Sequence, residues 1–404
     1  MFNRIDRRMF TILMIVIVQI IGASMILPIL PIYARRQFAM SEEVVTLLFS
    51  SFFLAQFLAG PIIGRLSDIY GRLPVLIISQ IGTVISFVLI AIAPNMAWLF
   101  FARILDGITG GNIIVAQAYV TDITPPKQRT QALGYIFAGF GTGFIIGPAV
   151  GGILSSAFGP QIPFIIAAIA AALTVVLTWV ALDETLTPEQ RAANRTRSGS
   201  NLNPNQILHN VPLVLVLLIG FGVQFGLSII QSTFPLFGED VLFDGYTAQQ
   251  TSLGIGLLLS SAGLGQVITQ VFLLKRLLRR FDETSLVIVG NIIRGVGSLG
   301  LIIVGVPWLA APMIALFASG GGIAMPALQS LATETVPDEM RGGVLGVYQS
   351  ATSVGTILGS ALSGLMFALA TPLPFLVSGG LSLLLVLPVF YIMRRRQVQP
   401  AAVS

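Results

Sequence analysis

The sequence predicts an all-α integral membrane protein with twelve transmembrane helices in two pseudo-symmetric six-helix bundles. Three observations support this fold class: an apolar composition, twelve long apolar runs and an internal repeat. Of the 404 residues, 55% are hydrophobic and 10% are charged, and the mean hydropathy is +0.89. Because an ordinary soluble domain carries roughly 25% charged residues, this composition favours lipid as the surrounding solvent.

Each predicted span is a mostly apolar run of about 20 residues or more, which is the length that crosses a bilayer as a helix. Membrane β-strands are shorter, about 10 residues, and alternate apolar with polar positions. The runs here are apolar all round, so they predict helices. The predicted spans are residues 9–33, 44–64, 74–93, 96–120, 131–158, 162–182, 211–237, 251–274, 285–304, 308–332, 343–369 and 374–393.

The basic residues between these runs fall almost entirely on one side of the membrane. Only Arg35 and Arg36 would lie on the other side. The positive-inside rule then places both termini in the cytoplasm, which requires an even number of spans in the plasma (inner) membrane. The same distribution accounts for the net charge of +5 without a nucleic-acid partner.

A polar stretch and a repeat divide the chain into halves. Residues 183–210 are typical of a flexible cytoplasmic linker, between an N-terminal bundle (residues 1–182) and a C-terminal bundle (residues 211–404). The segment containing Asp122 and Arg129 parallels the segment containing Glu334 and Arg341 at one constant offset in the chain. A parallel repeat of two six-span halves is a transporter plan that permits alternating access.

The segment after the second run reads GRLSDIYGRLP. It resembles the signature G-x-L-x-D-x-x-G-R-[RK] of the major facilitator superfamily, with Leu73 standing where a second basic residue is usual. The matching residues are Gly64, Leu66, Asp68, Gly71 and Arg72. The resemblance implies a latch on the cytoplasmic side; the alternative is a solvated turn.

Elementary chemistry assigns roles within this predicted loop. Glycines permit a tight turn between helices. Asp68 is expected to cap or face a helix N-terminus, where negative charge is favoured. Arg72 is expected to pair with Asp122 at the end of the fourth span.

The fifth span carries a second motif, GFIIGPAVGG. It resembles the G-x-x-x-G-P-x-x-G-G motif of the antiporter branch, and the whole chain resembles tetracycline-resistance-type efflux proteins. Small residues let helices approach closely and proline removes one backbone hydrogen bond, so simple helix packing is the alternative reading. The motif residues are Gly143, Gly147, Pro148, Gly151 and Gly152.

The resemblance also has departures. Drug exporters of that type carry acidic residues in spans one, three and nine, and a histidine in span eight. The corresponding positions here hold Gln19, Ser86, Arg294 and Gln266. Tetracycline bound through a metal ion is therefore not the expected substrate.

Charged residues inside the spans are functional candidates because burying a charge in a bilayer costs at least about 2.5 kcal/mol. Asp106 is a candidate carrier of the coupling proton, tuned by Arg103 three positions earlier on the same helix side; a self-neutralising structural pair is the alternative. Arg294 is expected to attract an anionic substrate group, to pair with Asp106, or to bind backbone carbonyls. The remaining substrate-cavity candidates are Gln19, Gln56, Asn112, Gln117, Gln224 and Gln231.

These features predict a secondary active transporter that works by alternating access, as a functional monomer. Proton-coupled efflux of small amphiphilic compounds is the first hypothesis. A uniporter or importer of a small polar nutrient or organic anion is the alternative. An enzyme is not expected, because there is no cysteine and one histidine, His209, and no cofactor or metal is predicted.

Overall fold

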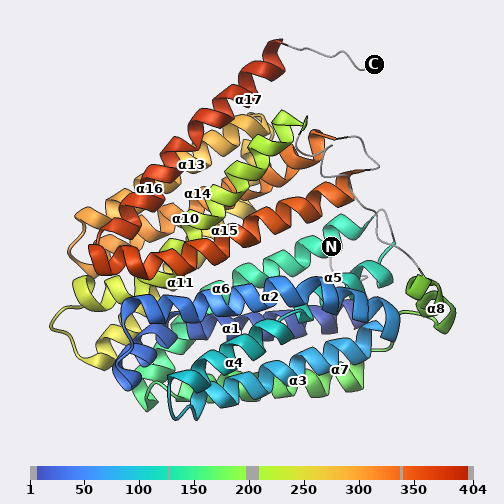
Figure 1. The fold of residues 1–404 in the computed structure, drawn as a ribbon, viewed down its shortest axis with the longest axis horizontal. Helices are drawn as coiled ribbons and strands as arrows, with labels where there is room; N and C mark the ends of the chain where they lie inside the picture. Colours follow the sequence, from blue (N-terminus) through green and yellow to red (C-terminus); the bar gives the residue numbers. More distant parts are fainter. Residues whose placement is uncertain (1–6, 126–127, 197–208, 337–339, 399–404) are drawn as a thin grey trace. The chain divides into compact units, whose positions relative to one another are not determined.

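The computed structural model describes residues 7–125, 128–196, 209–336 and 340–398. In these parts of the chain all regular secondary structure is helical (Figure 1). Twelve of the helical segments are long and apolar enough to cross a membrane. The predicted all-α fold with twelve membrane helices is therefore confirmed.

Contacts divide the chain into two compact units, which are described separately. The first comprises Met1–Ser198 and Gly245–Ser260. Its helices are α1 (Arg7–Phe38), α2 (Glu42–Tyr70), α3 (Arg72–Ala91), α4 (Met96–Thr109), α5 (Asn112–Ile123), α6 (Arg129–Phe158), α7 (Ile162–Ala181), α8 (Pro188–Thr196) and the first part of α11 (Ala248–Ile268). Its core includes fully buried Ile12, Leu76 and Tyr119.

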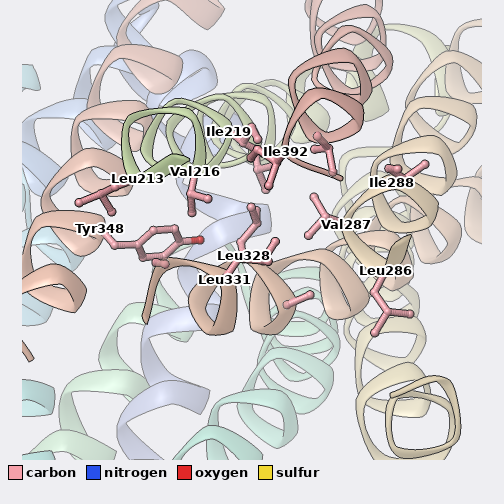
Figure 2. Close-up of a cluster of buried hydrophobic side chains, with 14 of the residues drawn as sticks. Leu213, Val216, Ile219, Leu286, Val287, Ile288, Leu328, Leu331, Tyr348 and Ile392 are labelled. Atoms are coloured by element: carbon pink, nitrogen blue, oxygen red, sulfur yellow. The ribbon is translucent and has the colours of Figure 1, made fainter. Parts of the chain in front are cut away.

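The second unit comprises Gly199–Asp244 and Ser261–Ser404. Its elements are α10 (Val211–Phe237), η2 (Gly238–Leu242), the rest of α11, η3 (Thr269–Leu273), α12 (Leu274–Leu277), α13 (Glu283–Ile303), α14 (Pro307–Glu334), α15 (Arg341–Leu369), α16 (Leu373–Leu384) and α17 (Val386–Val398). Figure 2 shows its core, in which Val216, Val287, Leu328 and Tyr348 come from four different helices. The predicted division at residues 182 and 211 stays a prediction.

Each unit contains the same helix crossing, built on small residues. In the first, a β-carbon on Gly147 of α6 would lie 2.7 Å from the Ile21 carbonyl oxygen of α1. In the second, a β-carbon on Gly359 of α15 would lie 2.5 Å from the Phe225 carbonyl oxygen of α10. The absence of a side chain therefore lets the backbones meet at equivalent places in the two units.

In both units a serine hydroxyl group forms a hydrogen bond across this helix crossing. Ser24 Oγ of α1 donates to the Gly143 carbonyl at 2.8 Å, and Ser228 Oγ of α10 donates to the Thr356 carbonyl at 2.7 Å. A contact between consecutive helices also repeats: Arg129 Nε at the start of α6 donates to the Thr121 carbonyl of α5, and Arg341 Nε at the start of α15 donates to the Thr333 carbonyl of α14. The sequence repeat thus corresponds to repeated three-dimensional contacts.

The polar stretch 183–210 differs from the predicted flexible linker in its described part. Residues 188–196 form α8. The helix begins in a capping box: the Thr187 amide donates to Gln190 Oε1 at 2.9 Å, and the Gln190 amide to Thr187 Oγ1 at 3.3 Å. Pro188 follows at the first helical position, where its missing N–H costs nothing. The rest of the predicted linker, residues 197–208, lies outside the described residues.

Candidate functional site

A buried ion pair lies on α4 of the first unit. Arg103 Nη1 donates to Asp106 Oδ2 at 2.7 Å, and each residue is only 6% exposed. The spacing of three residues places both side chains on one face of the helix. At close range in a low-dielectric surrounding, two opposite charges compensate each other far better than water-exposed charges do.

Helix α2 covers this face because α4 carries a glycine there. A β-carbon on Gly107 would lie 2.7 Å from Ala55 Cβ, so only glycine permits the crossing. The approach brings the Phe52 ring to 4.2 Å from the guanidinium carbon of Arg103, a favourable cation–π distance. Phe52 was not among the sequence candidates, since nothing in a run of phenylalanines marks one as the partner of a charge.

The fourth span breaks one turn after Asp106. Helix α4 ends at Thr109 and α5 begins at Asn112, with Gly110 and Gly111 between them. The Gly110 amide donates to the Gly107 carbonyl at 3.2 Å, and Gln56 Nε2 donates to the Gly110 carbonyl at 3.4 Å. Breaks in membrane helices are tolerated where polar groups satisfy the freed backbone. A titratable carboxyl therefore lies beside a local backbone irregularity.

The second unit contains a different buried charge. Arg294 of α13 is completely buried. Its Nη2 donates to the Val223 carbonyl of α10 at 2.8 Å, and its guanidinium carbon lies 4.7 Å from the centre of the Phe317 ring of α14. Of the three roles predicted for Arg294, the structure shows the hydrogen bond to a backbone carbonyl. Asp106 is paired with Arg103 and not with Arg294.

The other predicted cavity residues are dispersed. Gln19 and Asn112 are buried, and Gln56, Gln117, Gln224 and Gln231 are half-buried. Gln19 Nε2 and Gln224 Oε1 are buried polar atoms without a hydrogen-bond partner. Gln56 is hydrogen-bonded to Gly110, directly after the helix that carries Asp106.

The predicted cytoplasmic motif forms a polar cluster at one end of the first unit. Arg72 Nε lies 2.9 Å from Asp122 Oδ2, and Arg72 Nη1 lies 2.6 Å from Asp68 Oδ1. Ser67 Oγ accepts a further bond from Arg72 Nη1 at 2.7 Å. A single guanidinium thus joins the end of α2, the start of α3 and the end of α5.

The turn of the predicted loop begins later than expected, and of the two roles expected for Asp68, capping a helix N-terminus is wrong. Gly64, Leu66 and Asp68 lie inside α2, which continues to Tyr70, so Gly64 makes no turn and Asp68 caps no helix N-terminus. The turn is made by Gly71 alone, whose φ of 113° favours glycine. Asp68 instead pairs with Arg72 four residues later.

The residue that caps α3 comes from far along the chain. Glu184 Oε1 accepts from the Arg72 amide at 3.0 Å, and Glu184 Oε2 accepts from the Leu73 amide at 3.1 Å. A carboxylate at this position satisfies amides that have no partner within the helix. Sequence reasoning missed Glu184, because a cap supplied from over a hundred residues away leaves no local pattern.

Helix α8 is held against the same cluster. Arg191 Nη1 donates to the Tyr70 carbonyl at 3.3 Å, and Asn194 Nδ2 donates to the Asp68 carbonyl at 3.2 Å. Hydrogen bonds from its own backbone amide and from Thr187 hold the pKa of Glu189 below its ordinary value. The segment Thr-Pro-Glu-Gln is a recognisable capping box, and it is the signal by which this helix could have been found.

The predicted antiport motif is a two-sided packing surface on α6. Gly143, Gly147 and Gly151 face α1. On the other side, a β-carbon on Gly152 would lie 2.7 Å from the Ser252 carbonyl of α11, and one on Gly256 would approach the Pro148 carbonyl. The glycines therefore let α6 contact two neighbouring helices at backbone distance within the first unit.

Twelve helices long and apolar enough to cross a membrane, a repeated helix crossing and buried charges are the features of a multi-span membrane protein. The chain belongs to the Major Facilitator Superfamily, whose family model matches residues 12–250 and 245–403. This confirms the family predicted from the sequence motifs.

Individual relatives and one solved structure agree with that assignment. The chain is 30% identical to the class H tetracycline resistance protein of Pasteurella multocida, over 90% of each chain. It is 28% identical to multidrug resistance protein 2 of Bacillus subtilis (strain 168), again over 90% of each. A peptide transporter in complex with sulfate shares the fold, with a TM-score of 0.77 and 15% identity, covering 98% of this chain and 96% of the other. The predicted resemblance to the tetracycline-resistance branch is thereby confirmed.

Proposed function

We propose that this protein exports small amphiphilic compounds by alternating access, driven by the uptake of protons. The single observation that carries the proposal is the buried Arg103–Asp106 pair beside the break in the fourth span. The names of the relatives, tetracycline and multidrug resistance proteins, support export over the import of a nutrient.

In this proposal, the Arg103–Asp106 pair couples proton uptake to a rearrangement of helices α2 and α4. With Asp106 ionised, the two charges form a locally neutral unit against α2. Protonation of the carboxyl leaves the Arg103 charge uncompensated, and in a low-dielectric surrounding this is a large change in energy. Gly107 and Gly110 place that change at the α2–α4 crossing and at the helix break. The backbone can rearrange there because the helical hydrogen bonding is already interrupted.

The test is proton flux in everted membrane vesicles that carry the protein. A panel of fluorescent amphiphilic compounds of positive, neutral and negative charge is added to energised vesicles. An exported compound is expected to dissipate part of the proton gradient. Asp106→Asn is expected to abolish this flux, because an amide cannot take up the proton.

Asp244→Asn is the matched control, because Asp244 is exposed in the turn before α11. It is expected to keep the proton flux of the wild-type protein. The proposal fails if no compound in the panel moves protons, or if Asp106→Asn transports and couples like the control.

We further propose that both termini lie in the cytoplasm and that the transporter functions as a monomer in the plasma (inner) membrane. The support for orientation is the distribution of basic residues, of which only Arg35 and Arg36 would face outward. Labelling of single cysteines introduced near each terminus tests it directly, since the chain has no cysteine of its own.

A further inference from the structure

Arg294 is a buried positive charge without an internal counter-charge. It lies near the middle of the span Glu283–Ile303 and is completely buried. A guanidinium keeps its charge in proteins. Within the described residues no carboxylate lies at ion-pair distance from it, and its one hydrogen bond is to the Val223 carbonyl. A charge at this depth is costly and usually marks a function.

Other buried polar atoms on α13 and α10 are also unpaired. Arg294 Nε has no hydrogen-bond partner. Asn291, three residues earlier and so on the same face of α13, is completely buried, and neither its Nδ2 nor its Oδ1 has a partner. On α10, Gln224 Oε1 is unpaired directly after Val223. Buried polar groups normally have partners, so two unused donors, Arg294 Nε and Asn291 Nδ2, and two unused acceptors, Asn291 Oδ1 and Gln224 Oε1, need an explanation.

On one side, helix α14 meets the Arg294 side chain with its backbone at two glycines. A β-carbon on Gly321 would lie 3.2 Å from Arg294 Nη1, and one on Gly320 would lie 2.7 Å from Arg294 Cγ. Phe317 covers another side with its ring. The arginine is therefore enclosed by an aromatic face and by the backbone at two glycines, so these residues of α14 supply no side-chain partner for its charge.

We propose that Arg294 and Asn291 bind the carboxylate of an exported amphiphilic compound. Two N–H groups of a guanidinium match the two oxygens of a carboxylate, and such charge-assisted bonds are among the strongest in proteins. The Asn291 amide donates a further bond. The proposal rests on the proposed export function and names its substrate class: organic anions with an apolar body.

The test measures binding of a matched series of probes to the purified protein in nanodiscs at one pH and without a gradient. The probes are naphthoate, naphthamide and naphthylmethylammonium, which share an aromatic body and differ in charge. The wild-type protein is expected to bind naphthoate about tenfold or more tightly than naphthamide. Arg294→Gln is expected to remove that preference.

Asn291→Asp and Asn291→Leu form the decisive pair, because both remove the amide and only the first adds a carboxylate three residues from Arg294. Asp106 occupies the corresponding distance from Arg103 in the other buried pair. Asn291→Asp is expected to lose the preference for naphthoate completely, whereas Asn291→Leu is expected to keep most of it. Arg294→Lys is expected to keep part of the preference for naphthoate, since lysine retains the positive charge but lacks the planar guanidinium group.

The proposal is overturned if the wild-type protein does not distinguish naphthoate from naphthamide, or if Asn291→Asp binds naphthoate as tightly as Asn291→Leu. The measurement involves no proton movement. Failure of proton coupling in vesicles and failure of anion recognition in nanodiscs are therefore separate results.

Discussion

The two buried arginines of this protein differ in one respect that decides their chemistry. Arg103 and Arg294 both lie within spanning helices, both stack on a phenylalanine ring, and both have an unpartnered Nε. Arg103 has Asp106 as a counter-ion at 2.7 Å. Arg294 has a backbone carbonyl. The comparison separates the two proposals: the buried arginine with its own acid is the candidate for proton coupling, whereas the one without an acid is the candidate for binding an anion from outside the protein.

The largest effect that would sharpen this comparison is expected from Asp106→Leu. The substitution leaves the Arg103 charge buried and unpaired, and it cannot be discharged by losing a proton. Breaking a buried pair in this way costs about 3–5 kcal/mol of unfolding free energy. Unfolding in mixed micelles measures it.

The double variant Arg103→Met with Asp106→Leu is the control for that loss. Replacing both charges by apolar groups removes the unpaired buried charge, so most of the lost stability is expected to return. A double variant as unstable as Asp106→Leu alone would mean that packing at the α2–α4 crossing, and not charge, sets the cost.

A smaller effect is expected from Asp122→Asn in the cytoplasmic cluster. Asp122 also pairs with an arginine, but its side chain is 24% exposed and Arg72 keeps Asp68 as a second partner. The expected loss is about 1 kcal/mol or less, and it should shrink as salt is added. A loss as large as that of Asp106→Leu would show that burial does not separate the two ion pairs.

The smallest effect is expected from Arg294→Met. The change removes one hydrogen bond and a ring contact, but it also removes an uncompensated buried charge, so the two contributions nearly cancel. The unfolding free energy is expected to stay within about 1 kcal/mol of the wild-type value. If the unfolding free energy falls by several kcal/mol, Arg294 stabilises the fold, and this would count against a binding role.

Sequence reasoning succeeded where the signal is local. Twelve apolar runs predicted the spans, and the three-residue spacing of Arg103 and Asp106 predicted a shared helix face, which the structure displays as an ion pair. It went wrong at the end of α2, because the glycine at position 64 resembles a turn residue although the helix continues past it to Tyr70. Within the predicted linker it also missed the helix Pro188–Thr196, which begins in a capping box of Thr187 and Gln190.

By itself, the sequence determined that lipid surrounds this protein, how many spans it has and which family it belongs to. Hydropathy, charge asymmetry and short motifs are properties of neighbouring residues along the chain, so no coordinates are needed to recognise them. Only the tertiary structure decided which groups meet: Glu184 with the start of α3, Phe52 with Arg103, and Arg294 with a carbonyl in place of an acid. These contacts depend on where helices distant in sequence cross, and the crossings are set by small residues whose partners the sequence does not name.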